Sequence, residues 1–245
     1  MKLIVSLAAC WLIGNVLNVN AVFASESLPE IEISEIQPGV FLHTSNSRVE
    51  GYGLVSSNGL VVVDGSKAFI IDTPWSDRDT QQLVAWIHAQ QLELMGSLST
   101  HSHQDRTAGI PWLNAQAIPT YASVLTNELL KQQGQALASN PFEGPEFSIA
   151  DGLIEIYYPG GGHTIDNLVV WLPRVNILVG GCLIRALGTN NLGYTGEASI
   201  EAWPTTVAKV QAKYPNAKWV IPGHGEVGDQ RLLEHTKQLS IEASN

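Results

Sequence analysis

Six residues in this sequence are of types that bind transition metals, and they occur in clustered or glycine-flanked settings. They are His101, His103, Asp105, His163, Cys182 and His224. The first three fall within five positions as H-x-H-x-D, and each of the other three directly follows a glycine, which lets the backbone bend and approach closely. Imidazole, thiolate and carboxylate are the usual ligands of zinc. Six of them can form two zinc sites, one of three histidines and one of a carboxylate, a thiolate and an imidazole.

The spacing of these residues indicates a site assembled by the fold. After the H-x-H-x-D cluster, the remaining ligand types follow at gaps of 60, 19 and 42 residues. Closed structural zinc sites usually take their ligands in short, paired spacings instead. The other mature histidines, His43, His88 and His235, have no such neighbours, so we interpret them as surface or hydrogen-bonded core residues.

The segments that must position these residues alternate between strand and helix patterns. Strands are predicted at 31–36, 40–44, 53–56, 60–63, 68–71, 95–100, 154–158, 168–172, 177–179 and 219–221. Asn58-Gly59 predicts a hairpin turn between two of them, because that dipeptide favours the positive φ such a turn needs. A helix is predicted from Ser76, with Ser76 and Asp79 as a capping box.

Further helices are predicted to begin near Arg106 and to cover 122–133, 199–213 and 229–240. No Gly/Ser-rich or Pro-rich linker divides the chain, so we expect one domain with helices packed on sheet faces. The predicted ligands lie mostly at strand ends and in loops, where rigid scaffolds present reactive groups.

Composition excludes several classes of protein. The chain has 245 residues, 44% hydrophobic and 15% charged, which is too apolar and too poor in charge for intrinsic disorder. A formal net charge of -10 argues against a nucleic-acid partner, because such proteins need basic surfaces. Two cysteines are too few for a scaffold held by disulfides.

Residues 1–24 have the pattern of a secretory signal peptide. Lys2 precedes an apolar run from Leu3 to Val16, and small residues end the stretch at Ala24. This predicts a mature domain over 25–245, located in the periplasm. A membrane anchor is the first alternative, although asparagines interrupt the run before about 20 apolar residues. Lipidation at Cys10 is the second, although little hydrophobic sequence precedes that cysteine.

Five motifs give the mature chain a resemblance to the metallo-β-lactamases of subclass B1. They are Ile71-Asp72-Thr73-Pro74-Trp75, His101-Ser102-His103-Gln104-Asp105, Pro159-Gly160-Gly161-Gly162-His163-Thr164, Gly180-Gly181-Cys182 and Gly223-His224-Gly225. The resemblance implies an α/β (α+β) fold, a four-layer αβ/βα sandwich of two mixed sheets with helices on the outer faces. Arg106 stands where lactonases, glyoxalase-II-like enzymes and subclass B3 enzymes have a histidine, and His101 stands where subclass B2 has asparagine.

The resemblance implies two Zn²⁺ ions per chain, with His101, His103 and His163 at the first and Asp105, Cys182 and His224 at the second. It implies hydrolysis of the β-lactam amide by a zinc-bound hydroxide, with Asp105 also orienting the nucleophile. Asp72 and Arg106 would support the ligands from beneath. The substrates would be penicillins, cephalosporins and carbapenems, so the protein would confer antibiotic resistance as a carbapenemase.

Two positions differ from the commonest subclass pattern and resemble the German and Dutch imipenemase branch. Arg185 stands where many members have lysine, and it would hold the substrate carboxylate. Tyr194 stands where many have asparagine, either as a hydrogen-bond donor to the lactam carbonyl or as a wall of the site. Trp75 would line the floor, unless it is a core tryptophan. Residues 45–51 match the family's flexible flap, with Val49 and Tyr52 as its apolar contacts.

Three other functions are compatible with the residues alone. A zinc hydrolase of lactones or thioesters is the first, and a non-catalytic periplasmic zinc-binding protein is the second. A redox role for Cys182 is the third, which a single thiol without a resolving partner makes improbable. We expect a β-lactam as the only small-molecule partner, no stable membrane association after signal cleavage, and a monomer.

Overall fold

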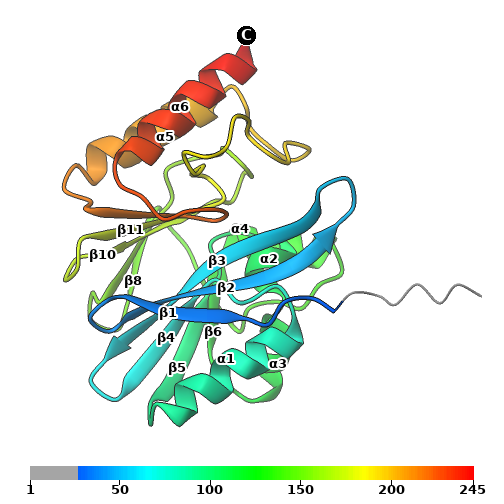
Figure 1. Ribbon diagram of the computed structural model, residues 1–245, viewed down its shortest axis with the longest axis vertical. Helices are drawn as coiled ribbons and strands as arrows, with labels where there is room; N and C mark the ends of the chain where they lie inside the picture. Colours follow the sequence, from blue (N-terminus) through cyan, green and yellow to red (C-terminus); the bar gives the residue numbers. More distant parts are fainter. Residues whose placement is uncertain (1–26) are drawn as a thin grey trace, which may run out of the picture.

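Two mixed β-sheets pack face to face in the computed structural model, which describes residues 27–245. Helices α1 (Asp77–Ala89) and α3 (Ile110–Ala115) lie beside the first sheet, and α5 (Trp203–Lys213) and α6 (Arg231–Ser244) lie against the second (Figure 1). The remaining helices are α2 (Gln104–Thr107) and α4 (Val124–Gln132). This arrangement confirms the predicted four-layer αβ/βα sandwich. The predicted signal peptide lies outside the described residues.

The first sheet has seven strands in sequence order. They are β1 (Glu32–Gln37), β2 (Val40–Val49), β3 (Gly53–Asp64), β4 (Lys67–Ile71), β5 (Glu93–Leu98), β6 (Thr120–Ser123) and β7 (Asn140–Phe142). Strands β1 to β4 pair antiparallel, and β4 to β7 pair parallel. The sheet is therefore mixed, with its parallel half joined through helices.

The second sheet has the order β12-β11-β10-β9-β8. Its strands are β8 (Glu146–Ile149), β9 (Ile154–Tyr157), β10 (Val169–Leu172), β11 (Ile177–Gly181) and β12 (Trp219–Pro222). Only β11 and β12 pair parallel. Of the helices in residues 27–245, none combines the length and hydropathy that a membrane span requires.

Strand β3 shows how the layers are held together. Leu60 and Val62 pack in the cluster between the sheets, whereas Val61 packs in the cluster beneath α1 with Leu83 and Ile87. All three β3 residues are at most 2% exposed. A strand covered on both faces needs apolar side chains at consecutive positions, because successive residues point to opposite faces. The run from Leu60 to Val63 meets that requirement.

The predicted hairpin at Asn58-Gly59 is wrong, because β3 runs through it without a turn. Glycine is required at position 59 because a Cβ there would collide with the ring of His43 on β2. The Asn58 amide instead donates to the carbonyls of Pro222 at 3.0 Å and Gly225 at 2.7 Å, tying the first sheet to the loop after β12.

The turn between β2 and β3 lies farther along, at residues 50–52, where Gly51 has φ +78°. Residues 45–49 of the predicted flap consequently belong to β2, paired with β3. The flap is thus the tip of a long two-stranded ribbon, which projects beyond the rest of the sheet (Figure 1).

The predicted cap of α1 is half confirmed. The backbone N–H of Asp79 donates to Ser76 Oγ at 3.1 Å, but the Asp79 carboxylate pairs with Arg78 at 2.6 Å. Three later helices begin after their predicted starts. They are α4 at Val124, because 120–123 form β6, α5 at Trp203 and α6 at Arg231. The sequence analysis also missed the short strands β6, β7 and β8.

Neighbouring parallel strands deliver the predicted ligands to one edge of the sandwich. In the β11–β12 pair, Gly181 is opposite Pro222, so Cys182 and His224 follow directly after adjacent strand ends. In the β4–β5 pair, Ile71 is opposite Leu98, so Asp72 lies beside the segment that leads to His101. Parallel pairing brings the carboxyl ends of neighbouring strands together, which explains how distant segments meet.

Candidate metal centre

All six predicted ligands meet in one cluster at this edge. Their ligand atoms form overlapping groups of three within 4.8 Å. The groups are His101–His163–Cys182, His101–His103–Asp105 and Asp105–Cys182–His224. Residues as far apart in sequence as His101 and His224 are therefore neighbours. By contrast, His43, His88 and His235 belong to none of these groups, as their sequence settings predict.

Three imidazole rings form one half of the cluster, which we call the histidine half. The rings of His101, His103 and His163 have centroids 4.8 to 5.1 Å apart and meet edge to face. His103 Nδ1 lies 3.0 Å from His163 Nε2. His101 Nε2 is buried and has no hydrogen-bond partner among the described residues. Several ring nitrogens thus converge on one small space.

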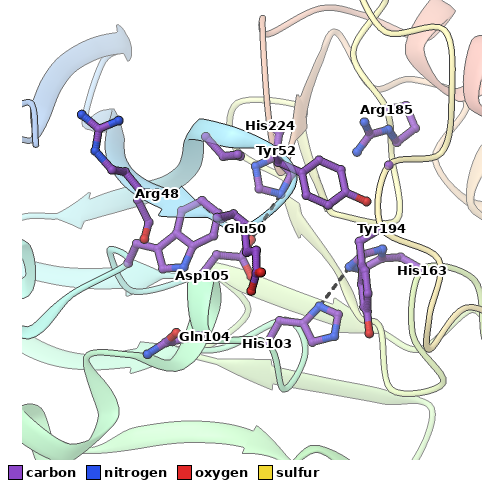
Figure 2. Close-up of a pocket in the computed structure, with 15 residues that line it drawn as sticks. Arg48, Glu50, Tyr52, His103, Gln104, Asp105, His163, Arg185, Tyr194 and His224 are labelled. Carbon is purple, nitrogen blue, oxygen red and sulfur yellow. Dashed lines mark hydrogen bonds and ion pairs between the residues drawn. The ribbon is translucent and has the colours of Figure 1, made fainter.

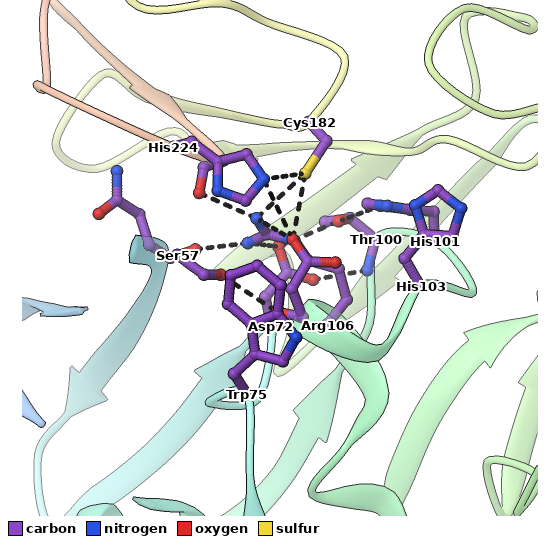
Figure 3. Close-up of polar contacts among 12 residues, drawn as sticks. Ser57, Asp72, Trp75, Thr100, His101, His103, Arg106, Cys182 and His224 are labelled. Atoms are coloured by element: carbon purple, nitrogen blue, oxygen red, sulfur yellow. Dashed lines mark hydrogen bonds and ion pairs between the residues drawn. The ribbon is translucent and has the colours of Figure 1, made fainter. Parts of the chain in front are cut away.

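The other half, which we call the anionic half, contains Asp105, Cys182 and His224. Cys182 Sγ lies 3.4 Å from Asp105 Oδ2 and 3.3 Å from His224 Nε2 (Figure 3). His224 Nε2 also lies 3.3 Å from Asp105 Oδ2. Cys182 is a free, buried cysteine. One oxygen, one sulfur and one nitrogen therefore face one another at nearly equal distances.

A fully buried guanidinium lies directly beneath the anionic half. Arg106 Nη2 is 2.8 Å from Asp105 Oδ2 and 3.1 Å from Cys182 Sγ, and it donates to the Gly223 carbonyl at 2.9 Å. Its Nη1 is 3.3 Å from Asp72 Oδ2 (Figure 3). A buried charge is tolerated only when it is paired and hydrogen-bonded, and Arg106 meets this condition.

Asp72 connects Arg106 to the segment that carries the histidines. Its two carboxylate oxygens accept from the Thr100 N–H at 2.7 Å and the Thr100 hydroxyl at 3.0 Å. The residue itself has φ +60°, an uncommon left-handed conformation for aspartate. Asp72 therefore fixes the residue before His101, which agrees with its predicted position beneath the ligands.

Two of the three rings, those of His101 and His163, stay neutral over the physiological range. Burial, with repulsion from His103, lowers the pKa of His163 to about 3. Burial and the nearby His163 hold the pKa of His101 well below its usual range. A neutral imidazole keeps a lone pair available, which is the state that binds a metal.

The anionic half has the opposite electrostatics. Burial alone would raise the pKa of Asp105, but the charge of Arg106 outweighs it and holds that pKa well below the usual range. Burial likewise opposes the charging of His224, yet Cys182 and Asp105 raise its pKa to about 10. Asp72 differs, because burial raises its pKa to about 6 despite Arg106.

Two hydrogen bonds select the ring nitrogens that face the cluster. His224 Nδ1 is 2.6 Å from the Ser56 carbonyl, so it donates there and Nε2 is the nitrogen that faces the cluster. His103 Nε2 is 2.9 Å from Glu197 Oε2, which leaves Nδ1 free in the same way. The sequence analysis missed Glu197, because it lies 94 residues from His103 in a loop without a motif.

The donor set fits zinc. Zinc takes nitrogen, sulfur and carboxylate ligands, and here such atoms converge. The outer nitrogens of His103 and His224 are already bonded to Glu197 and to the Ser56 carbonyl. The buried, unpartnered Nε2 of His101 supports this assignment, because a buried polar atom without a partner is costly. The three-histidine set and the aspartate, cysteine and histidine set each provide three ligands.

A pocket of about 530 Å³ opens beside the cluster (Figure 2). His103, Asp105, His163 and His224 line its floor, and the flap residues Val49, Tyr52 and Val55 line another side. The flap thus provides apolar surface over the polar cluster. Val49 and Tyr52 were the two flap contacts that the sequence predicts.

Arg185, Tyr194 and Trp75 all line this pocket. Arg185 Nε donates to the Asn191 carbonyl at 3.2 Å, and its guanidinium lies over Gly193. The Tyr194 ring packs edge to face on His103 at 5.8 Å, with its hydroxyl against Gly196. Trp75 is half-buried, with its ring 5.9 Å from that of His224. Its indole is therefore part of the pocket wall.

Comparisons with known proteins agree with this geometry. The model of the metallo-beta-lactamase superfamily matches residues 52–224. A metallo-beta-lactamase type 2 of Pseudomonas aeruginosa is 45% identical over 218 residues, covering 89% of this chain and 87% of that protein. One from Bacteroides fragilis is 37% identical over 224 residues, covering 89% and 90%.

Solved structures give the same result. That of TMB-1 has a TM-score of 0.88 and 62% identity, covering 89% of this chain and 100% of the other. That of the DIM-1 metallo-beta-lactamase has a TM-score of 0.88 and 56% identity, with the same coverage. The chain therefore belongs to the metallo-β-lactamase superfamily. Within it, the chain is a zinc-dependent β-lactam hydrolase of subclass B1, which confirms the resemblance to the imipenemase branch.

Proposed function

We propose that two zinc ions bind per chain, one in each half of the cluster. His101, His103 and His163 would hold the first, and Asp105, Cys182 and His224 the second. The observation that carries this proposal is the convergence of all six ligand-type side chains beside one open pocket. A storage protein would need no such pocket beside the ligands, and the named β-lactamase relatives also favour lactam over lactone or thioester hydrolysis.

Bound zinc supplies Lewis acidity that lowers the pKa of a water and polarises a carbonyl. The protein residues set the conditions for that chemistry. Arg106 keeps Asp105 in its anionic, ligating state and lies 3.1 Å from Cys182 Sγ, and Asp72 holds the loop before His101. The carboxylate of Asp105, which also faces the pocket, orients the attacking water.

The pocket walls bind and orient the substrate. Arg185 pairs with the carboxylate that β-lactams carry, a contact its planar guanidinium can make through two N–H groups. Trp75 and the flap residues Val49 and Tyr52 cover the ring system and exclude water. Tyr194 serves as a wall, because its hydroxyl lies against Gly196.

The substrate range includes carbapenems as well as penicillins and cephalosporins. The test is imipenem hydrolysis by the purified mature chain, followed by absorbance. We expect hydrolysis, loss of activity with EDTA and recovery with added zinc. A protein that holds two zinc ions but hydrolyses no β-lactam would contradict the function. Hydrolysis of penicillins without imipenem would contradict only the carbapenem assignment.

The N-terminal pattern supports export to the periplasm, with residues 1–24 removed as a signal peptide and 25–245 remaining. The chain would then act as a monomer, without nucleic-acid partners or stable membrane association. Terminal sequencing of protein from a periplasmic extract tests the cleavage, with a new N-terminus near Ser25 expected. An intact Met1, or a lipid on Cys10, would contradict it.

A further inference from the structure

A second pocket, of about 450 Å³, adjoins the catalytic pocket and differs from it in chemistry. The two pockets share Trp75 and Gln104 as lining residues. Gln104 is exposed at this boundary, and in Figure 2 its amide points away from the histidines. A group bound in the catalytic pocket therefore needs only to pass these two side chains to reach the second pocket.

Half of the twelve residues that line the second pocket carry an amide or a hydroxyl, so we call it the amide pocket. Gln133 and Gln135, at and just beyond the end of α4, line its outer part. Asp77, at the start of α1, is the only ionisable side chain among its described lining residues. Amides both donate and accept hydrogen bonds, so this lining suits an uncharged polar group and disfavours a carboxylate.

One buried side chain marks this pocket as a binding site. Ser102 lines it, is 1% exposed, and its hydroxyl has no hydrogen-bond partner among the described residues. A buried hydroxyl without a partner is costly, and a polar group in the pocket would remove that cost. The flap side of the catalytic pocket differs, because it combines the apolar Val49 and Val55 with the charged Arg48 and Glu50 and presents no amide.

We propose that the amide pocket binds the outer, uncharged polar end of long acyl side chains on β-lactam substrates. This inference rests on the proposed function. Apolar side chains then pack beneath the flap, whereas polar ones pass Trp75 and Gln104 toward Gln133 and Gln135. The volume lies within the range of small-ligand pockets and accommodates a single ring with its substituents.

The test compares ampicillin with piperacillin, which is ampicillin acylated on its amino group by a dioxopiperazine carbonyl. The two penicillins share every other atom of their skeleton, and benzylpenicillin, which lacks the amino group, serves as a third substrate. In the double variant Gln133→Ala/Gln135→Ala, the ratio of kcat/KM for piperacillin to that for ampicillin should fall about tenfold, as expected for two lost hydrogen bonds.

Gln132→Ala is the matched control, because this exposed glutamine is adjacent in sequence but does not line the pocket. In this control, the ratio of kcat/KM for piperacillin to that for ampicillin should stay within about twofold of the parent, as is usual for surface substitutions. An unchanged ratio in the double variant would overturn the proposal. Equal losses for both penicillins would do so too, because they would indicate a structural role for the glutamines.

A second readout does not depend on turnover. In ¹⁵N spectra of the zinc-loaded protein, ring-opened piperacillin should shift the side-chain amide signals of Gln133 and Gln135, and ring-opened ampicillin should not. Identical spectra with the two compounds would overturn the proposal. If the parent hydrolyses no penicillin, the proposed function fails. The spectra still decide whether the amide pocket binds the dioxopiperazine end of the acyl side chain.

Discussion

Different physical effects hold the two halves of the metal cluster in protonation states that can bind a metal. In the histidine half, burial keeps His101 and His163 neutral, and no buried countercharge is needed. In the anionic half, Asp105 and Cys182 are held beside a fully buried guanidinium, Arg106. Desolvation prepares the first half, and a fixed charge prepares the second.

This difference indicates which substitutions should destabilise the cluster most. Removing the charge of Arg106 leaves the buried carboxylates of Asp72 and Asp105 without their counterion. The histidine half contains no equivalent single support. The outer partner of His103, Glu197, is 48% exposed and is therefore easier to replace with solvent. The two halves should respond differently to substitution.

The largest effect is expected from Arg106→Met. Asp72 and Asp105 would remain buried without their partner, so the free energy of unfolding should fall by about 3–5 kcal/mol. Urea unfolding of the zinc-loaded protein measures this. The surface variant Arg231→Met, which removes only the exposed pair with Asp229, should cost at most about 1 kcal/mol. Equal losses of unfolding free energy in Arg106→Met and Arg231→Met would contradict the stabilising role of the buried Arg106 charge.

Cys182→Ser should separate the two halves by metal content. Serine is a poor zinc ligand near neutral pH, so affinity for the second zinc should fall by more than about 100-fold, which is the loss that changes outside the ligand set can reach. Zinc analysis after dialysis should give one ion per chain instead of two, with strongly reduced turnover. Unchanged activity with one bound zinc would contradict the two-site assignment.

Glu197→Ala should weaken the histidine half alone. Loss of the carboxylate frees the His103 ring, and affinity for the first zinc should fall by about tenfold, the lower end for such partners because Glu197 is exposed. Glu197→Gln, which still accepts from Nε2–H, should recover part of the loss. Competition with a chelator measures both. The exposed Glu201→Ala serves as control, and an equal loss there would refute the assignment.

The smallest effect is expected at His43, where the pH dependence of stability tests how burial and the nearby charge of Arg106 act on a histidine. Burial, together with the charge of Arg106, lowers its pKa to about 3. The unfolded chain takes up a proton near pH 6.5 and the folded protein does not, so stability falls as pH decreases between these values. From pH 7 to 5.5 this loss should approach about 1.4 kcal/mol.

The variant His43→Gln should lose this part of the pH dependence, and the exposed His88→Gln should keep it. Urea unfolding of the zinc-free protein at the two pH values measures the difference between each variant and the parent. Parallel pH profiles for His43→Gln and the parent would show that His43 accepts a proton within the fold.

Local sequence was sufficient wherever a short pattern reports a single physical requirement. The apolar run from Leu60 to Val63 requires burial on both faces, and β3 provides it. Ser76 capped α1 as predicted, because the bond spans only three residues. The H-x-H-x-D motif and the glycine-flanked ligands identified the metal centre, because those residue types are rarely placed together without a metal.

Local sequence failed where a distant segment decides the outcome. The dipeptide Asn58-Gly59 predicts a turn, but in the structure it lies within a continuous strand. The ring of His43 leaves no space for a side chain at Gly59, and the Asn58 amide donates to the Pro222 carbonyl. Glu197 has no motif, since only the fold brings it to His103.

The sequence by itself determined which atoms can bind zinc and which long apolar runs are buried, because side-chain chemistry and hydrophobic periodicity are local properties. Only the tertiary structure decided that Arg106 neutralises one half of the cluster, and that Trp75 and Gln104 stand between two pockets of different polarity. Charge pairing and cavity shape depend on distances between segments remote in sequence, and those distances exist only once the sheets have packed.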